Sequence, residues 1–332
     1  MRSNRTAMRP RQQFLDETTF SSTLKAFERD YELLREKLVE HAEQPRKKAG
    51  ALRTWANRTW STFQLRFTIG DSLDELSQYL TNVVEAFERY LDALESVDEE
   101  EYDPPFLLDH IIDNYVDYLN MISAAFLLHR EDLVPRIAAL NLDTEYDRSD
   151  AIIESLLSFC LTDRPTLDSI YWKEYKPLLA TINKKTQQER AASMEKYVKG
   201  WYKSMKGSAH FWGKHEQIEP DYSPYDGYWA ICAAAFTYLY DIDDNKYREE
   251  MVYPKDMVDY ARSKPRQPVK LEGGSEIFRV LGGQACPLEG QWFSPAKPDS
   301  ARHFKQGEAM PVFDSEYGLT IWQMKNPVDD SE

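Results

Sequence analysis

Apolar residues at helical spacing run through the first two thirds of this 332-residue chain and constrain its fold more than any other feature. From residue 20 to residue 38 the apolar positions are separated alternately by four and three residues, which places them on one face of a helix. We expect this face to lie in the core, although its seven-residue period would also suit a homodimer seam. The residues are Phe20, Leu24, Phe27, Tyr31, Leu34 and Leu38.

The same periodicity predicts helices as far as residue 264. Long helices are expected over residues 46–67, 73–94 and 108–126, with Ser72 and Glu75 forming a capping box before the second. Shorter helices are expected near residues 131–140, 150–161, 166–181 and 187–206. Residues 225–240 are alanine-rich and almost free of polar side chains, which predicts a central buried helix with Trp229 and Tyr240 in the core. A last short helix starts at Pro254.

The composition changes near residue 264, where glycine and proline become frequent. Residues 265–332 hold 7 of the 13 glycines and 7 of the 17 prolines, and residues 276–281 and 319–324 have the composition of strands. We therefore predict a mainly α fold, a multi-helix bundle of about eight to ten helices with a small β-rich C-terminal appendage. The predicted domains are residues 15–163, an acidic helical domain, residues 164–264, a second helical domain, and residues 265–332, the appendage.

Negative charge is concentrated in one block of the chain. The whole sequence has 56 acidic and 41 basic residues, net −15, but residues 61–163 alone hold 23 acidic and 5 basic residues, net −18. A protein that grips nucleic acid carries a basic surface, so this balance argues against direct nucleic-acid binding. It favours a basic protein partner, while a solvated face balanced by basic blocks elsewhere explains the same charge.

No segment has the pattern of a membrane span or an export signal. The longest apolar run, residues 230–236, is far shorter than the roughly 18 residues that span a bilayer. The basic start of the chain is not followed by the apolar region of a secretory signal. The three cysteines, Cys160, Cys232 and Cys286, are too few and too scattered for a disulfide framework. We expect a cytoplasmic protein without membrane contact.

The sequence lacks the common motifs of catalysis and cofactor binding. It has no Gly-rich phosphate loop, no Gly-x-Ser-x-Gly, no His-Glu-x-x-His and no Glu-x-x-His. The run that starts at Asp241 departs from a calcium loop, because Lys246 occupies the sixth position, where glycine is needed, and Val252 the twelfth, where glutamate is needed. We predict no catalytic residues, no metal and no cofactor, and a protein that is not an enzyme.

Three groups of carboxylates are candidates for binding a basic partner. Those on the fourth helix recur every four residues and would form a ridge with about 6 Å between neighbours. Such carboxylates can meet the lysines and arginines with which a nuclease holds phosphates, or they can be a plain solvated face. The groups are Asp98, Glu99, Glu100 and Glu101 in a loop, Asp109, Asp113 and Asp117 on the fourth helix, and Asp241, Asp243 and Asp244 in a turn.

Three stretches near the end of the helical region carry a family resemblance. Residues 225–230 (YDGYWA), 238–244 (YLYDIDD) and 253–262 (YPKDMVDYAR) resemble the C-terminal domain of PoNi-type immunity proteins. That family protects bacteria against polymorphic nuclease toxins, often delivered by type VI secretion. The acidic helical region looks like the family's N-terminal domain, so the resemblance covers residues 15–262. The tail, at residues 283–287, 290–292, 307–311 and 318–322, is similar to the C-terminal module of other toxin-immunity proteins.

The resemblance implies a stoichiometric inhibitor that covers its cognate toxin, a basic nuclease domain, in a one-to-one complex. Three alternatives stay open: an inhibitor of a toxin directed at nucleotides or NAD, an acidic DNA-mimic or adaptor protein, and a helical metal-dependent hydrolase that uses Asp243, Asp244 and a histidine. A toxin gene beside this one favours an immunity protein over an adaptor. A bound metal, or a cleft of carboxylates with raised pKa, favours the hydrolase.

Overall fold

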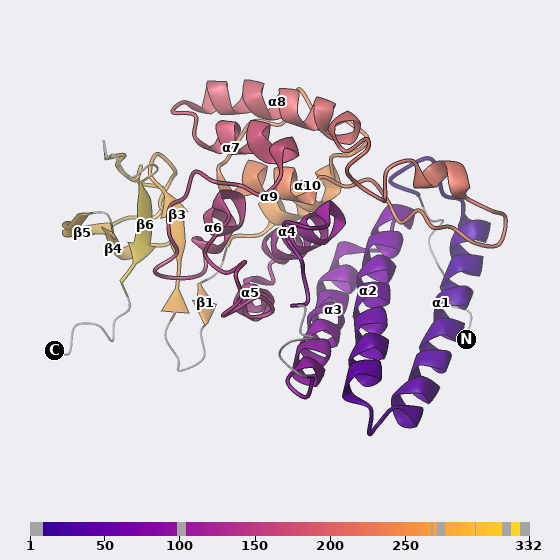
Figure 1. Ribbon diagram of the computed structural model, residues 1–332. Helices are drawn as coiled ribbons and strands as arrows, with labels where there is room; N and C mark the ends of the chain where they lie inside the picture. The colour runs from indigo at the N-terminus through magenta and orange to yellow at the C-terminus, as the bar shows by residue number, and fades with distance from the viewer. Residues whose placement is uncertain are drawn as a thin grey trace, which may run out of the picture. The chain divides into compact units, whose positions relative to one another are not determined.

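The fold is built mainly from helices (Figure 1). The computed structural model describes residues 9–97, 104–266, 268–270, 276–295, 297–313 and 320–325, and within these the chain forms ten α-helices and six β-strands. The predicted mainly α fold with a small β appendage is confirmed. The helices are α1 (Glu17–Glu40), α2 (Pro45–Ile69), α3 (Leu73–Leu94), α4 (Ile112–Leu127), α5 (Val134–Ala139), α6 (Ala151–Leu157), α7 (Lys176–Ile182), α8 (Gln187–Ser204), α9 (Ile231–Leu239) and α10 (Lys255–Ser263).

Two compact units share the chain. The first consists of Met1–Val116, Ala139–Thr144 and Met205–Trp229, and the second of Asp117–Ala138, Glu145–Ser204 and Ala230–Glu332. The units interleave along the sequence, whereas the sequence analysis divides the chain into three consecutive domains, and that division stays a prediction. None of the described helices is both long enough and apolar enough to cross a membrane.

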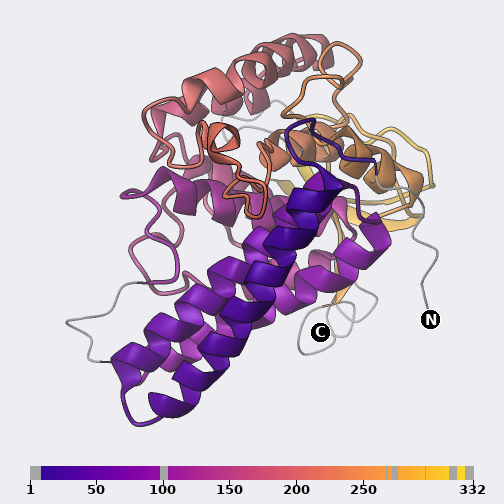
Figure 2. The ribbon, with the colours of Figure 1, turned by 90° about the vertical axis from the view of Figure 1, so that its right-hand side faces the viewer.

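The first unit is organised around α1, α2 and α3, three long helices that lie side by side (Figure 2). Asp16 caps α1 by accepting a hydrogen bond from the Thr19 amide at 2.8 Å, and Ser72 caps α3 through the Glu75 amide at 3.2 Å, as the capping box predicts. α2 ends at Gly70, whose φ of 105° is left-handed. A Cβ at this glycine would collide with the Arg9 carbonyl, so the turn needs glycine.

The apolar stripe of α1 is mostly a core face. Phe20, Phe27 and Leu34 are buried, and the other three members of the stripe are half-buried. α3 begins and ends at the predicted residues, 73 and 94. α2 is longer than the helix predicted over residues 46–67, by one residue at its start and two at its end. The regular spacing of apolar residues in these long helices is the reason for this agreement.

Three predicted helices begin later than expected. The one expected over residues 166–181 corresponds to α7, which starts at Lys176. The fourth was expected from residue 108, but α4 starts at Ile112 and residues 108–110 form a turn. The alanine-rich helix was expected over residues 225–240, but α9 covers Ile231–Leu239 only. Residues 225–230 are held in a non-helical path by Gly227, with a φ of 126°, and by the Trp229 indole, which donates to Thr68 Oγ1 at 2.8 Å. Trp229 and Tyr240 are nevertheless buried, as expected.

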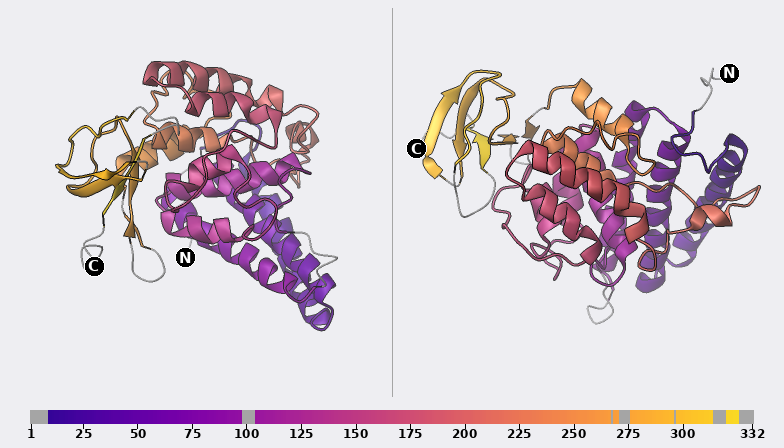
Figure 3. Two further views of the ribbon diagram at one scale, coloured as in Figure 1. Left: turned by 60° about the vertical axis from the view of Figure 1, so that its left-hand side comes forward. Right: turned by 90° about the horizontal axis from the view of Figure 1, so that it is seen from above.

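The second unit ends in the β appendage (Figure 3). Two strands, β1 (Val269–Lys270) and β2 (Glu276–Ile277), pair with each other. Strands β3 (Arg279–Leu281), β4 (Gly290–Ser294), β5 (Lys297–Phe304) and β6 (Ile321–Met324) form an antiparallel sheet in the order β3-β6-β4-β5. The sheet has its own apolar cluster, with Trp292 and Trp322 almost fully buried. The appendage is therefore a packed module, since its aromatic residues make a small core.

Candidate interaction site

An acidic turn follows the buried helix α9 and displays two of the predicted carboxylates. The turn runs from Asp241 to Asp244, and we call it the acidic turn. The Ile242 amide donates to the Thr237 carbonyl at 2.9 Å, which closes the end of the helix. Asp241 has a φ of 51°, a left-handed conformation that aspartate tolerates better than most residues. The carboxylates of Asp241 and Asp243 are exposed, so both are available to a partner.

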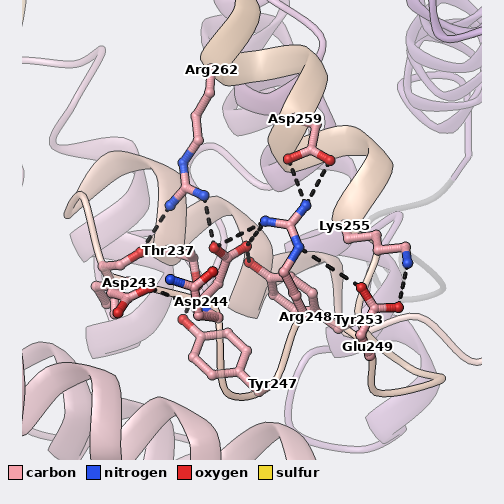
Figure 4. Close-up of polar contacts among 12 residues, drawn as sticks. Thr237, Asp243, Asp244, Tyr247, Arg248, Glu249, Tyr253, Lys255, Asp259 and Arg262 are labelled. Atoms are coloured by element: carbon pink, nitrogen blue, oxygen red, sulfur yellow. Dashed lines mark hydrogen bonds and ion pairs between the residues drawn. The ribbon is translucent and has the colours of Figure 1, made fainter.

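Asp244 faces inward and anchors the acidic turn. Only 4% of its side chain is exposed, so the expectation that it is an exposed interface carboxylate is wrong. Its Oδ1 lies 2.9 Å from Arg262 Nη1 and 3.4 Å from Arg248 Nη1, and its Oδ2 accepts a hydrogen bond from the Tyr253 hydroxyl at 3.2 Å (Figure 4). A buried carboxylate requires this kind of compensation, because burial without partners is very costly.

The two arginines extend this set of contacts into a network. Arg262 also donates to the Ile242 carbonyl at 2.8 Å, and so ties α10 to the backbone of the acidic turn. Arg248 Nη2 lies 2.8 and 2.7 Å from the two carboxylate oxygens of Asp259 on α10 (Figure 4). We call Asp244, Arg248, Tyr253, Asp259 and Arg262 the Asp244 network. It ties the acidic turn to α10 and so holds the turn in one conformation.

The pKa shifts in the Asp244 network follow from burial and pairing. Burial is the largest single influence and works against the charge on Arg262. The hydrogen bond to Asp244 and the nearby negative charges together outweigh burial and raise the pKa of the guanidinium. For Arg248 the hydrogen bond to Asp259 raises the pKa. Burial raises the pKa of the Tyr253 hydroxyl, so this group stays protonated and donates to Asp244. At neutral pH both arginines therefore stay charged and the Tyr253 hydroxyl stays a hydrogen-bond donor.

The ridge predicted on the fourth helix does not form as expected. Asp109 is exposed but lies in the turn before α4, where its carboxylate is 2.5 Å from His110 Nδ1. Asp113 is on α4, and its two oxygens accept hydrogen bonds from the backbone amides of His210 and Phe211 at 2.9 and 3.1 Å. Asp117, one turn further along, is half-buried. Asp113 thus has a structural task, and a ridge of three exposed carboxylates is wrong because α4 starts after Asp109.

A second acidic surface lies on α3 and was missed by the sequence analysis. Its carboxylates are separated by three, four and three residues, the spacing of one helix face, and this spacing was the signal that could have revealed it. Two of them are at the C-terminal end of α3, where the helix dipole disfavours negative charge by roughly 0.3–1 kcal/mol and where the last turn of the helix has no basic residue. Glu88 is half-buried and the others are exposed. The residues are Glu85, Glu88, Asp92 and Glu95.

The remaining predicted residues, Asp98, Glu99, Glu100 and Glu101, lie outside the described residues. Within the described part of the chain, no three His, Cys, Asp or Glu side chains are grouped closely enough to hold a metal ion. Asp243 and Asp244, proposed for a hydrolase, point to different environments, because Asp243 is exposed and Asp244 is paired with arginines.

Comparison with known proteins places the acidic turn inside a family match. Residues 148–257 match the family described as "PoNe immunity proteins (PoNi), C-terminal". This chain resembles PoNi-type immunity proteins. The matched segment contains the acidic turn together with Arg248 and Tyr253 of the Asp244 network, and it ends within α10. By its description, the matched family consists of immunity proteins for PoNe.

A solved structure shows the same fold. The crystal structure of protein PA2201 from Pseudomonas aeruginosa is similar with a TM-score of 0.57, at 19% sequence identity, over 78% of this chain and 92% of that one. At this identity the similarity concerns the fold alone. No curated protein matches the sequence.

Proposed function

We propose that this chain is an immunity protein that neutralises a cognate secreted nuclease toxin by covering its active or substrate-binding site in a one-to-one complex. The observation that carries this proposal is the PoNi-type match over residues 148–257. The partner would be a basic nuclease domain, in keeping with a net charge of −15. Cytoplasmic location and delivery of the toxin by type VI secretion belong to the same proposal.

The acidic turn is the contact surface that we favour. Asp241 and Asp243 are exposed, lie within the matched segment and are held in place by the buried Asp244 beside them. A nuclease needs lysines and arginines to bind phosphates, and a preformed pair of carboxylates can occupy them. The acidic surface of α3 and the predicted loop at residues 98–101 are further candidates, since they carry the same charge.

The direct test is co-expression of this chain with the product of the neighbouring gene. We expect the two proteins to co-purify in a one-to-one complex and the nuclease activity of the neighbour to disappear. A complex that blocks a different activity would keep the inhibitor role and overturn the nuclease target. If the neighbouring product neither binds nor is inhibited, the immunity function is wrong, and the adaptor hypothesis becomes the better one.

A further inference from the structure

A groove in the first unit contains two arginines around one tryptophan. It lies across α1, α2 and α3 and has a volume of about 340 Å³. Its lining includes Trp55 of α2, Arg35 of α1 and Arg89 of α3. The Cζ atoms of the two arginines lie 5.5 and 5.7 Å from the centre of the Trp55 ring. We call this region the Trp55 groove.

Neither arginine in the Trp55 groove has an ion-pair partner among the residues that the structure describes. Both are exposed, in a chain with 15 more acidic than basic residues. Two other arginines of α2 are paired: Arg58 lies 2.7 Å from Asp30, and Arg66 lies 2.5 Å from Asp71. Arginine is a favoured residue for binding carboxylates and phosphates, so two unpaired guanidinium groups in a concave site suit an anionic group.

Trp55, which lines the groove, is held in place before any partner binds. Trp55 is half-buried, and the Tyr31 ring lies against it with a centre-to-centre distance of 4.7 Å. The Tyr31 hydroxyl is 3.3 Å from Thr59 Oγ1, one turn further along α2. Tryptophan and arginine are both enriched in binding hot spots, and a tryptophan that is already held in place loses little further side-chain entropy on binding.

The charge and the volume of the Trp55 groove limit which chemical groups it can bind. Glu85 is the one carboxylate among the residues that line the groove, so with Arg35 and Arg89 the groove has a net charge of +1. This matches a single carboxylate better than a polyanion, and the acidic residues of α3 would repel a nucleic acid strand. A volume of 340 Å³ is at the small end for ligand pockets and accommodates one or two side chains.

We propose that the Trp55 groove binds an acidic segment of a protein partner, with one carboxylate between Arg35 and Arg89 and an adjacent apolar side chain on Trp55. Identifying that partner as the toxin rests on the proposed function. The inference that the groove binds a carboxylate beside an apolar side chain does not depend on that function. The immunity protein would then hold its toxin through a second contact of opposite polarity to the acidic turn. A partner must then carry a basic group opposite the acidic turn and an acidic group opposite the Trp55 groove. This requirement selects between partners more strongly than net charge does.

The groove itself is tested with small probes on the full chain. Acetyl-Phe-Glu-amide and acetyl-Phe-Gln-amide are titrated to about 10 mM, and the Trp55 indole N–H signal, assigned with Trp55→Phe, is followed by NMR. We expect the Glu peptide to shift this signal in a saturable way, the Gln peptide to bind at least fivefold more weakly, and Arg35→Gln/Arg89→Gln to abolish the difference. No shift with either peptide, or a stronger shift with a short DNA oligonucleotide, would overturn the proposal.

The role toward the toxin is tested by titration calorimetry with the product of the neighbouring gene. We expect Arg35→Gln/Arg89→Gln to weaken binding at least tenfold, while the control Arg29→Gln/Lys37→Gln, also exposed on α1 but outside the groove, changes it less than twofold. Unchanged affinity in the groove variant would leave the immunity function standing and refute this contact. If the unmodified chain does not bind the neighbour, the proposed function fails, and the peptide titration still decides on the groove.

Discussion

The Asp244 network and the Trp55 groove use arginine in opposite ways. In the network, Arg248 and Arg262 are paired with carboxylates of the same chain, and the result is a fixed backbone turn. In the groove, Arg35 and Arg89 lie over the Trp55 ring, have no ion-pair partner among the described residues and stay exposed. The first arrangement stabilises the protein itself, whereas the second leaves charge available for another molecule. Pairing, more than residue type, therefore separates structural from binding arginines here.

The largest effect is expected from removing the centre of the network. Asp244→Ala should lower the free energy of unfolding by about 2–4 kcal/mol, because Arg262 and Tyr253 lose a buried acceptor. Both arginines are partly exposed, which keeps the loss from being larger. Urea unfolding measures it. Asp259→Ala is the matched control, since this carboxylate is 55% exposed and its loss should cost less than about 1 kcal/mol. Equal losses in the two variants would contradict a central role for Asp244.

A third arrangement, that of Arg266, lies between these extremes. Glu131, in the short 3-10 helix Glu131–Leu133, has its Oε1 3.9 Å from Arg266 Nε, and neither atom has a hydrogen-bond partner among the described residues. Burial raises the pKa of the Glu131 carboxyl to about 7, only partly offset by Arg266. The folded state thus favours the protonated form more than the unfolded chain does. Glu131 therefore contributes stability below pH 4.5, and this contribution is lost as the pH rises to about 7.

Glu131→Gln should remove this pH dependence. At pH 7.5 we expect the variant to be more stable than the unmodified chain by about 1–3 kcal/mol, because an incompletely paired buried charge is gone. Near pH 4.5 the two proteins should unfold at similar urea concentrations. Urea titrations at several pH values between 4.5 and 8 measure this. A variant less stable than the unmodified chain at pH 7.5 would show that Glu131 and Arg266 form an effective ion pair instead.

The acidic turn should matter for binding and little for stability. Asp241→Lys/Asp243→Lys is expected to weaken the complex with the neighbouring gene product at least tenfold, or about 1.4 kcal/mol, and to reduce the salt dependence of its association rate. The matched control is Glu289→Lys/Asp299→Lys, the same charge change on exposed residues of the appendage. If both variants weakened the complex equally, the net charge of the protein, and not the acidic turn, would account for the binding.

The smallest effect is expected in the Trp55 groove of the isolated protein. Arg35→Gln/Arg89→Gln should change the free energy of unfolding by less than about 0.5 kcal/mol per residue, since exposed residues without ion pairs add little to stability. Thermal unfolding followed by circular dichroism measures this. A loss of more than about 2 kcal/mol would mean that the two guanidinium groups hold the three helices together, and the contrast with the Asp244 network would disappear.

Much of the helical layout was predictable because long amphipathic helices repeat their signal. α2 and α3 match the predicted ranges within two residues, and the capping residue Ser72 was identified correctly. The errors occurred where a distant contact overrides a local tendency. Residues 225–230 carry the helical composition of α9, but the hydrogen bond between Trp229 and Thr68 and the left-handed Gly227 keep them out of the helix.

The candidate sites show the same difference between local sequence patterns and contacts made by distant residues. The sequence alone determined the fold class, the apolar face of α1, the β appendage, the acidic balance and the family resemblance, because these depend on local periodicity, composition and short motifs. Only the tertiary structure decided that Asp244 is buried while Asp243 is exposed, since Arg262 is eighteen residues away in the chain. It also decided that Arg35 and Arg89 flank Trp55, from three separate helices. The pairing of charges depends on which side chains folding brings together. Local sequence patterns do not reveal these tertiary neighbours.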